Sequence, residues 1–253
     1  MIARIPRALA LLAAMASLTL VAPAAVVSAD ASTSATPQSS KNWRACTKRL
    51  DGISTPLVRS QRSVTIVNQT SRSHARVSFW VRTNSRCSLK RLFLTRTGRL
   101  GYGGTVAANK RHQSTGTTPL GTFTMTQAFG VGSKPDMWLP YHRVKKGDYW
   151  VGDNASRYYN SLRNKSQGGF RYRLRQSNVN SSEYLPHYRG QYRYAVVINF
   201  NRAPQKTVRY RGTGIFLHVK GSGATAGCVA ISKGQLRTVL AYLKPGDKIT
   251  IAR

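Results

Sequence analysis

A loop of small residues carries the side chains of this sequence that are best suited to nucleophilic chemistry. The loop runs from Gly221 to Gly227 and leads into an apolar strand through Cys228, and His218 lies ten residues before that cysteine. A nucleophilic thiol needs a base that removes its proton, backbone amides that stabilise an oxyanion, and neighbours small enough to admit a carbonyl group. We therefore interpret Cys228 and His218 as a candidate nucleophile and base. A buried structural cysteine near a hydrogen-bonded histidine is the alternative interpretation of this spacing.

Two further cysteines, Cys46 and Cys87, flank a predicted N-terminal hairpin. An extracellular chain with three cysteines either leaves one thiol free or forms a bond between molecules. We expect a disulfide between Cys46 and Cys87, which would contribute about 4 kcal/mol in the chain-entropy description, while Cys228 keeps its thiol. None of the three cysteines has C-x-x-C spacing, which excludes a zinc ribbon or a zinc finger.

The N-terminal segment has the pattern of a secretory signal. Arg4 and Arg7 precede an uncharged run from Ala8 to Ala29, which ends in the small-residue triplet Val27-Ser28-Ala29. This pattern predicts a signal peptide over residues 1–29, and an uncleaved signal-anchor helix is the alternative. Residues 30–41 are mostly Ser, Thr, Ala, Pro and Gln, which predicts a flexible linker, and residues 42–253 are expected to form a single domain. We therefore expect a secreted protein of the cell envelope.

The composition indicates a folded protein with a strongly basic surface. The chain of 253 residues has 40 Lys and Arg against 7 Asp and Glu, a formal net charge of +33, and 41% of its residues are hydrophobic. Arg alternates with Tyr, Leu or Val in residues 170–175, 192–194 and 208–211, which predicts extended segments with one basic face. Such a face would attract anionic cell-wall polymers, and a solvated strand face is the alternative. Secretion argues against nucleic acid as a partner.

Alternation of apolar and polar residues predicts a mostly β fold. Residues 64–67 and 77–81 predict a hairpin with a loop over 68–74, and further strands are expected at 122–129, 192–200, 214–219, 228–231 and 248–252. One helix is expected. Ser232 to Gln235 forms a capping box, and apolar residues follow at helical spacing from Leu236 to Leu243, until Pro245 and Gly246 end the run.

Glycosidase chemistry is not expected, because it needs a pair of carboxylates that flank the scissile bond. Glu183 is the only glutamate of the chain, and the neighbouring carboxylates Asp148 and Asp153 lie close together in the sequence. We expect Asp153 to support its own turn.

Four segments, in the right order, resemble the catalytic domain of the L,D-transpeptidase (YkuD-type) family. The first is Lys110 with residues 114–123, which resembles the pattern Lys-x(n)-Gly-x-x-Thr-Pro-x-Gly-x-Phe. The second, residues 150–160, resembles Trp-x-x-Asp-x-x-Ser-x-Tyr-Tyr-Asn, and residues 197–204 are similar to the strand and turn before the histidine. The fourth joins residues 214–219 to 225–232 around Cys228. The resemblance covers residues 101–253, so residues 42–100 form a separate N-terminal hairpin portion of the expected domain.

The resemblance implies a twisted β-sheet sandwich around an active-site cleft, with the predicted helix capping it after the catalytic cysteine. It implies a secreted peptidoglycan L,D-transpeptidase that forms 3→3 cross-links between stem peptides through a thioester on Cys228. His218 would be the general base, and the backbone amides of Gly227 and Cys228 would form the oxyanion hole. No metal or organic cofactor is implied. The residues expected to bind substrate are Thr225, Ser222, Tyr158 and His187.

Two departures from the family pattern keep alternatives open. Family members commonly carry polar residues where this chain has Ala226 and Ala230, and Val219 follows the histidine, so a backbone carbonyl is expected to orient His218. An L,D-carboxypeptidase would share the nucleophile and pass the acyl group to water. A catalytically inactive module that binds anionic wall polymers would use the same scaffold and its basic surface.

Overall fold

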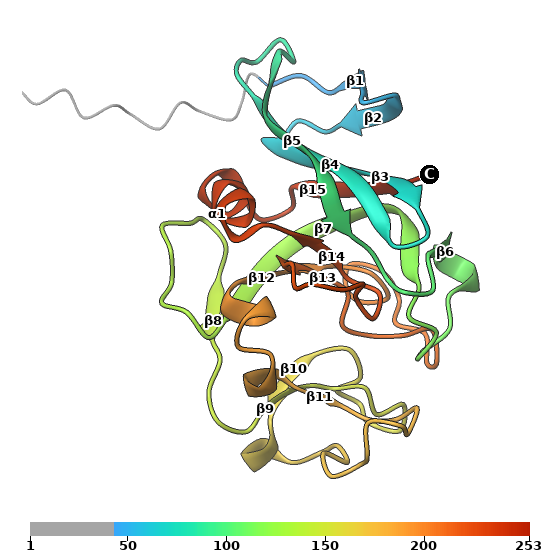
Figure 1. The fold of residues 1–253 in the computed structure, drawn as a ribbon. Coiled ribbons are helices and arrows are strands. Elements are labelled where there is room, and N and C mark those ends of the chain that lie inside the picture. Colours follow the sequence, from blue (N-terminus) through green and yellow to red (C-terminus); the bar gives the residue numbers. More distant parts are fainter. Residues whose placement is uncertain (1–42) are drawn as a thin grey trace, which may run out of the picture. The chain divides into compact units, whose positions relative to one another are not determined.

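A ten-stranded sheet forms the centre of residues 43–253, the part of the chain that the computed structural model describes (Figure 1). The predicted signal peptide and linker lie outside the described residues. Neighbouring strands of the sheet follow the order β12 (Ala195–Ile198), β13 (Phe216–Val219), β14 (Val229–Ile231), β5 (Leu89–Arg99), β4 (His74–Arg82), β3 (Ser63–Ser71), β15 (Lys248–Ala252), β7 (Thr118–Gly130) and β6 (Thr105–Ala107), with β8 (Tyr141–Arg143) also paired to β7. Because β12 pairs with β7 as well, the sheet closes on itself into a barrel-like sandwich. The predicted mostly β fold class is confirmed.

The α-helix α1 (Lys233–Tyr242) packs into the main core, as its apolar spacing predicts. The Ser232 hydroxyl accepts a hydrogen bond from the backbone amide of Gln235, and the Gln235 side chain completes the capping box. Each fully buried aliphatic side chain contributes about 1.5–3 kcal/mol. The helix thus anchors the end of the preceding strand β14. The helix residues that are completely buried beside the strands are Leu236, Val239, Leu240 and, just after its last turn, Leu243.

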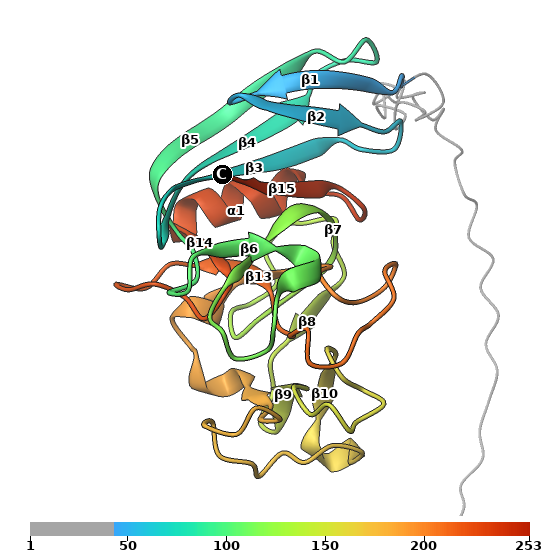
Figure 2. The same ribbon diagram turned by 90° about the vertical axis from the view of Figure 1, so that its right-hand side faces the viewer.

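The N-terminal hairpin of β1 (Cys46–Leu50) and β2 (Ile53–Leu57) lies at the far end of the molecule from β9 and β10, next to β3 and β4 (Figure 2). Leu50 and Leu57 pack against Val64 and Ile66 in a small separate core. The disulfide between Cys46 and Cys87 forms as predicted and ties β1 to the connection between β4 and β5. Cys228 is the free cysteine among the described residues.

The hairpin β3–β4 is longer than the sequence pattern predicts. Ser71 pairs with His74, so the turn contains only Arg72 and Ser73, and the predicted loop over residues 68–74 is wrong. The polar residues of that segment extend both strands because the ladder satisfies their backbone groups. Strand β5 was not predicted, because its pairing with β4 shifts register twice and its charged residues hide the alternation.

The three Arg-rich segments do not form the predicted basic strand faces. Residues 170–175 and 208–211 run as turns and coil, and residues 192 and 193 belong to a short 3-10 helix. The predicted alternation of buried and exposed side chains is present only at residues 192–194, where Tyr192 and Tyr194 are buried and Arg193 is exposed. These segments have no neighbouring strand whose ladder would hold them extended, so the charge is spread over loops.

A smaller three-stranded sheet lies on the side of the main sheet where β12 and β13 are found (Figure 1). It contains β9 (Asp148–Trp150), flanked by β10 (Leu162–Asn164) and β11 (Glu183–Tyr184). We call residues 148–193 the cap. An aromatic cluster that includes Phe129, Trp150, Tyr192 and Phe216 joins the cap to the main sheet. The 3-10 helices are η2 (Ala108–Lys110), η3 (Lys165–Gln167), η4 (Leu185–His187) and η5 (Gln191–Arg193).

Within residues 43–253, no helix combines the length and the apolar character that crossing a membrane requires.

Candidate active site

Two adjacent parallel strands position Cys228 and His218. In the pairing of β13 with β14, Leu217 lies opposite Val229 and His218 lies opposite Ala230. Leu217 and Val229 belong to the main core, whereas Cys228 belongs to the cluster beneath the cap. Since successive side chains of a strand point to opposite faces, the register sends His218 and Cys228 to the same face, toward the cap.

A cavity of about 430 Å³ lies on this face, within the size range of small-molecule sites. The cap, the turn at residues 213 and 214, and the loop before β14 all contribute to its wall. The lining residues are Gln176, Ser181, Ser182, Glu183, Tyr188, Gln191, Tyr192, Thr213, Gly214, His218, Gly221, Ser222, Gly223, Ala224, Thr225, Ala226 and Cys228. Residues 43–253 contain no group of three or more His, Cys, Asp or Glu side chains that could hold a metal ion.

The Cys228 thiol is buried and protonated in the resting site. Its Sγ donates a hydrogen bond of 3.2 Å to the carbonyl oxygen of Gly214 and accepts one of 3.3 Å from the backbone amide of Phe216. Burial raises the pKa of this thiol to about 12, and the nearby carboxylate of Glu183 adds to the increase. Attack by Cys228 therefore requires a base that removes the proton as the reaction proceeds.

The His218 imidazole, the candidate base, lines the same cavity. Its Nδ1 lies 2.9 Å from the carbonyl oxygen of Val219, so that backbone group orients the ring and leaves Nε2 as the proton acceptor. Burial lowers the pKa of His218 to about 4, which keeps the ring neutral at neutral pH. The hydrogen bonds among the described residues include none between this ring and the Cys228 thiol. Such contacts often form only when substrate is bound.

The loop before Cys228 is held by its own threonine. Thr225 Oγ1 donates to the carbonyl oxygen of Cys228 at 2.7 Å and accepts from the backbone amide of Gly227 at 3.2 Å. The Gly227 amide, predicted as an oxyanion donor, is therefore already bonded. Within residues 43–253 the Cys228 amide makes no such bond, so it is the donor that remains free for an oxyanion.

Gly227 is required by the shape of this loop. Its φ of +130° is a conformation that other residues rarely adopt, and a Cβ at this position would lie only 2.8 Å from the carbonyl oxygen of Thr117. The close approach of the two backbones fixes where Cys228 emerges into the cavity.

Arg111 is a buried cation behind the loop that the sequence reasoning missed. Its guanidinium donates to the carbonyl oxygens of Thr117 at 2.8 Å and Arg211 at 3.0 Å, and thereby ties two segments to the loop. Burial lowers the pKa of Arg111 to about 10, so it stays charged at neutral pH, and its charge lowers the pKa of the Cys228 thiol. The motif comparison singled out the neighbouring Lys110, which is exposed. The only indication of Arg111 in the sequence was that a second basic residue follows Lys110 of the motif.

Ser222 and Thr225, two of the four residues predicted to bind substrate, line the cavity, but Tyr158 and His187 do not. The ring of Tyr158 packs beneath the guanidinium of Arg163, with 3.4 Å between the guanidinium carbon and the ring centroid. His187 is exposed at the end of η4, and the next residue, Tyr188, is the one that reaches the cavity. The tight turn of η4 directs these two consecutive side chains differently.

Tyr192 connects His218 to the only glutamate of the chain. The two rings meet edge to face with centroids 5.5 Å apart, and the Tyr192 hydroxyl donates a hydrogen bond of 2.6 Å to Glu183 Oε1. Burial raises the pKa of Glu183 to about 7. Sequence reasoning considered Glu183 only as a glycosidase carboxylate and missed its place beside Cys228. Its uniqueness in the composition was the one available signal.

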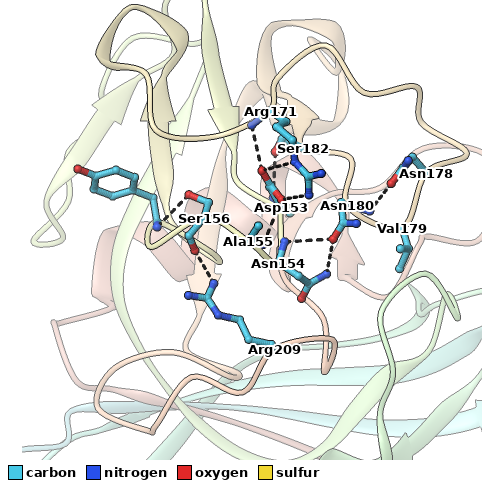
Figure 3. Close-up of polar contacts among 12 residues, drawn as sticks. Asp153, Asn154, Ala155, Ser156, Arg171, Asn178, Val179, Asn180, Ser182 and Arg209 are labelled. Atoms are coloured by element: carbon cyan, nitrogen blue, oxygen red, sulfur yellow. Dashed lines mark hydrogen bonds and ion pairs between the residues drawn. The ribbon is translucent and has the colours of Figure 1, made fainter.

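Polar contacts within the cap hold the segment that lines the cavity near residue 180 (Figure 3). Asp153 accepts hydrogen bonds from the Arg171 side chain at 2.5 and 3.0 Å and from its backbone amide at 3.0 Å. Asn154 donates through both its backbone and its side chain to Asn180 Oδ1. Asp153 thus supports its own turn, as expected, while the neighbouring Asn154 ties that turn to Asn180, next to the lining residue Ser181.

Comparison with known proteins places this architecture in a family. A family model described as the L,D-transpeptidase catalytic domain (YkuD) matches residues 64–251, so the chain belongs to the L,D-transpeptidase catalytic domain family. The match begins at β3, earlier than residue 101, where the motif resemblance began. The hairpin β1–β2 lies outside it.

Two solved structures are similar to the chain at low identity. L,D-transpeptidase 1 of Mycobacterium tuberculosis has 14% identity and a TM-score of 0.32, over 76% of this chain and 62% of that one. The L,D-transpeptidase (Yku) of Stackebrandtia nassauensis has 14% identity and a TM-score of 0.31, over 76% of this chain and 56% of that one. The chain thus spans about three fifths of these relatives. No curated protein matches it.

Proposed function

We propose that this protein is a cysteine-dependent L,D-transpeptidase that forms 3→3 cross-links between peptidoglycan stem peptides. The observation that carries the proposal is the cavity in which a free buried thiol, Cys228, and a neutral imidazole, His218, share one wall of an L,D-transpeptidase catalytic domain. The disulfide engages Cys46 and Cys87, which leaves Cys228 as the thiol available for covalent chemistry.

In the first half-reaction, Cys228 attacks the carbonyl between the third residue of a donor stem, a diamino acid, and its terminal D-Ala. His218 takes the thiol proton as the carbon–sulfur bond forms, because burial disfavours a resting thiolate. The backbone amide of Cys228 donates to the oxyanion. The proton then passes from His218 to the departing D-Ala nitrogen, and a thioester remains on Cys228.

In the second half-reaction, the side-chain amine of a neighbouring stem attacks the thioester carbonyl. The new amide bond replaces the carbon–sulfur bond, and the sulfur leaves and recovers a proton. Water in place of the amine would give the L,D-carboxypeptidase reaction with the same nucleophile. The two activities therefore differ in the fate of the thioester.

Mass spectrometry of the purified protein with a disaccharide-tetrapeptide tests the proposal. A dimer that has lost one D-Ala supports transpeptidation. A shortened tripeptide without dimer would replace the proposal with a carboxypeptidase. Unchanged substrate under conditions in which the protein binds walls would favour a catalytically inactive wall-binding module, the role suggested by Ala226 and Ala230.

We also propose that the protein acts outside the cytoplasm. Residues 1–29 would be its signal peptide, and residues 30–41 would be the linker to a single domain over residues 42–253. An uncleaved signal anchor is the alternative, and a protein that keeps Met1 would show it. The disulfide Cys46–Cys87 supports an oxidising compartment. The net charge of +33 supports contact with anionic wall polymers. N-terminal sequencing of the secreted protein tests this localisation, and an N-terminus at Asp30 is the expected result.

A further inference from the structure

Glu183 is a carboxylate without a cationic partner in a strongly basic protein. Among the described residues, Asp51, Asp148 and Asp153 each form an ion pair with an arginine or a histidine. Asp247 is buried without an ion pair, but both of its oxygens accept hydrogen bonds, from the backbone amides of Arg62 and Lys244 and from the Ser63 hydroxyl. Glu183 forms no ion pair either, and its one side-chain hydrogen bond comes from the uncharged hydroxyl of Tyr192. Glu183 is half-buried, and a carboxylate that is largely removed from water normally finds a compensating charge or hydrogen bonds to both oxygens. The absence of both here points to a cation that arrives with the substrate.

The free oxygen of this carboxylate lies near Gly214, the residue whose carbonyl the Cys228 thiol contacts. Tyr192 holds Oε1, while Oε2 accepts no hydrogen bond from residues 43–253 and lies 3.5 Å from the position that a Cβ on Gly214 would occupy. The carbonyl of the same Gly214 accepts the hydrogen bond of the Cys228 thiol at 3.2 Å. The carboxylate and the thiol therefore flank one backbone position on the cavity wall.

The cavity offers no other charged group to a ligand. Its lining contains no lysine, arginine or aspartate. The titratable groups that face Glu183 are Tyr188 and Tyr192 of the cap, Cys228 of the loop and His218 of β13. The Glu183 charge raises the pKa of both tyrosines and of the thiol. It therefore opposes formation of the Cys228 thiolate and is not explained by the first half-reaction.

We propose that Glu183 binds the ammonium group of the acceptor stem and removes its proton in the second half-reaction. This inference rests on the proposed transpeptidase function. The acceptor reaches the cavity as a primary ammonium ion, which cannot attack until it loses a proton. Glu183 Oε2 takes that proton, the neutral amine attacks the thioester carbonyl, the carbon–nitrogen bond forms and the carbon–sulfur bond breaks. The second nitrogen proton goes to the departing sulfur by way of His218, and Glu183 later releases its own proton to solvent.

The acid–base properties of the two groups fit this division of work. The neutral His218 ring carries no charge that would hold an ammonium ion, whereas the free oxygen of the Glu183 carboxylate attracts one. Burial raises the pKa of Glu183 to about 7, so it accepts a proton more readily than an ordinary carboxylate does. The cation would in turn favour the ionised carboxylate, because an opposite charge at short range compensates the cost of burial. Tyr192 positions the carboxylate through Oε1 and packs its ring on His218.

The test compares the purified wild-type chain with Glu183→Gln, which keeps the shape and an acceptor for the Tyr192 hydroxyl. Acylation is followed by adduct formation with a carbapenem, and transfer from the tetrapeptide thioester is followed with two acceptors: the stem-peptide amine and hydroxylamine. Hydroxylamine is already neutral at mildly alkaline pH. Asp136→Asn, which removes one negative charge from an exposed position, is the matched control.

We expect Glu183→Gln to acylate at least as fast as wild type, because removal of the charge lowers the pKa of the thiol. Transfer to the stem-peptide amine should fall about 100-fold, in the range of general acid–base catalysis, and lose its rise with pH near 7, while transfer to hydroxylamine stays within about twofold. If Glu183→Gln slows transfer to both acceptors equally, Glu183 has a structural role. If the variant raises the KM for the donor in acylation, the carboxylate binds the donor. Either result overturns the inference. If the wild type makes dimer and Glu183→Gln matches it, the inference alone fails. If the wild type makes no dimer, the proposed function fails first.

Discussion

The thiol of Cys228 donates its hydrogen bond to the backbone carbonyl of Gly214, at a distance of 3.2 Å. The thiol of the proposed nucleophile is therefore held as a neutral group by the backbone of the turn before β13, and the proposed base His218 is bonded to its own neighbour Val219. Binding of an acyl donor must break the thiol contact before Sγ can attack. If Cys228 is the nucleophile, as proposed, this contact keeps the thiol neutral until a donor displaces it.

Replacing Cys228 with Ala should abolish covalent chemistry and preserve the fold, because the preceding loop is already built from small residues. A carbapenem, whose strained β-lactam carbonyl mimics the acyl donor of this family, should add one equivalent of mass to the wild type and none to Cys228→Ala. Intact-protein mass spectrometry measures the adduct. An adduct of equal yield on both proteins would show that another residue is the nucleophile.

Replacing His218 with Ala should slow acylation about 10²–10⁴-fold and leave a rate that rises with pH. The buried thiol has a pKa of about 12, so without a base only a minute fraction is thiolate at neutral pH. Acylation rates measured across neutral to alkaline pH check this, with the exposed His112→Ala as the matched control. A residual rate that is independent of pH would contradict the assignment of His218 as the base.

Local sequence patterns were sufficient to predict the elements that position Cys228. The capping box at Ser232 and the leucines after it predicted α1, and the small-residue loop predicted that Cys228 lies at the start of the next strand. The pairing of Cys46 with Cys87 followed because a catalytic role required a free Cys228. Each of these inferences depends on neighbours within one element or on counting a single residue type.

The rest of the site depends on contacts between distant segments and on burial. Glu183 and Tyr192 reach Cys228 only because the cap folds over β13 and β14. An ordinary thiol has a pKa of about 8.5, and no sequence pattern indicates the burial that raises the pKa of Cys228 to about 12. Tyr158 matched a family pattern, but Arg163 and the turn at Gly169 hold its ring away from the cavity.

Replacing Asp153 with Asn should destabilise the cap. The buried Asp153 carboxylate accepts charge-assisted hydrogen bonds from Arg171, so the loss should be about 1–3 kcal/mol. The hydrogen bond from Arg171 holds the pKa of Asp153 below its usual range, so this contribution is present at neutral pH and is lost as the pH falls through the lowered pKa. Urea unfolding measures the change, and hydrogen exchange should rise at residues 176–182. Arg171→Gln should act in the same direction, whereas equal effects from Arg171→Gln and the exposed Arg175→Gln would contradict the pairing.

Retention on purified cell walls should weaken steeply between low and moderate salt. The basic side chains of this chain are spread over exposed loops, and exposed charges are screened beyond about 8 Å at physiological ionic strength. Pull-down of the purified protein on walls at increasing salt measures the effect, and walls stripped of their anionic polymers are the control. Retention that ignores salt would indicate recognition of a neutral sugar or peptide instead.

Ionisation of Glu183 should lower the folding stability as the pH rises, and Glu183→Gln should remove this pH dependence. Burial raises the pKa of Glu183 from its usual 4.5 to about 7, so between these values the folded state binds more protons than the unfolded state and this group lowers stability as the pH rises. His218 acts in the opposite sense, since its pKa falls from 6.5 to about 4 and stability is lost as the pH drops through that range.

Comparison of the wild type with Glu183→Gln isolates the effect of Glu183. In urea unfolding, the free energy of unfolding of Glu183→Gln should therefore increase relative to wild type as the pH rises from about 4.5 to 7. A difference between the two proteins that does not change with pH would show that the Glu183 carboxylate is not shifted by loss of contact with water, and would remove the physical basis for its role toward an ammonium ion.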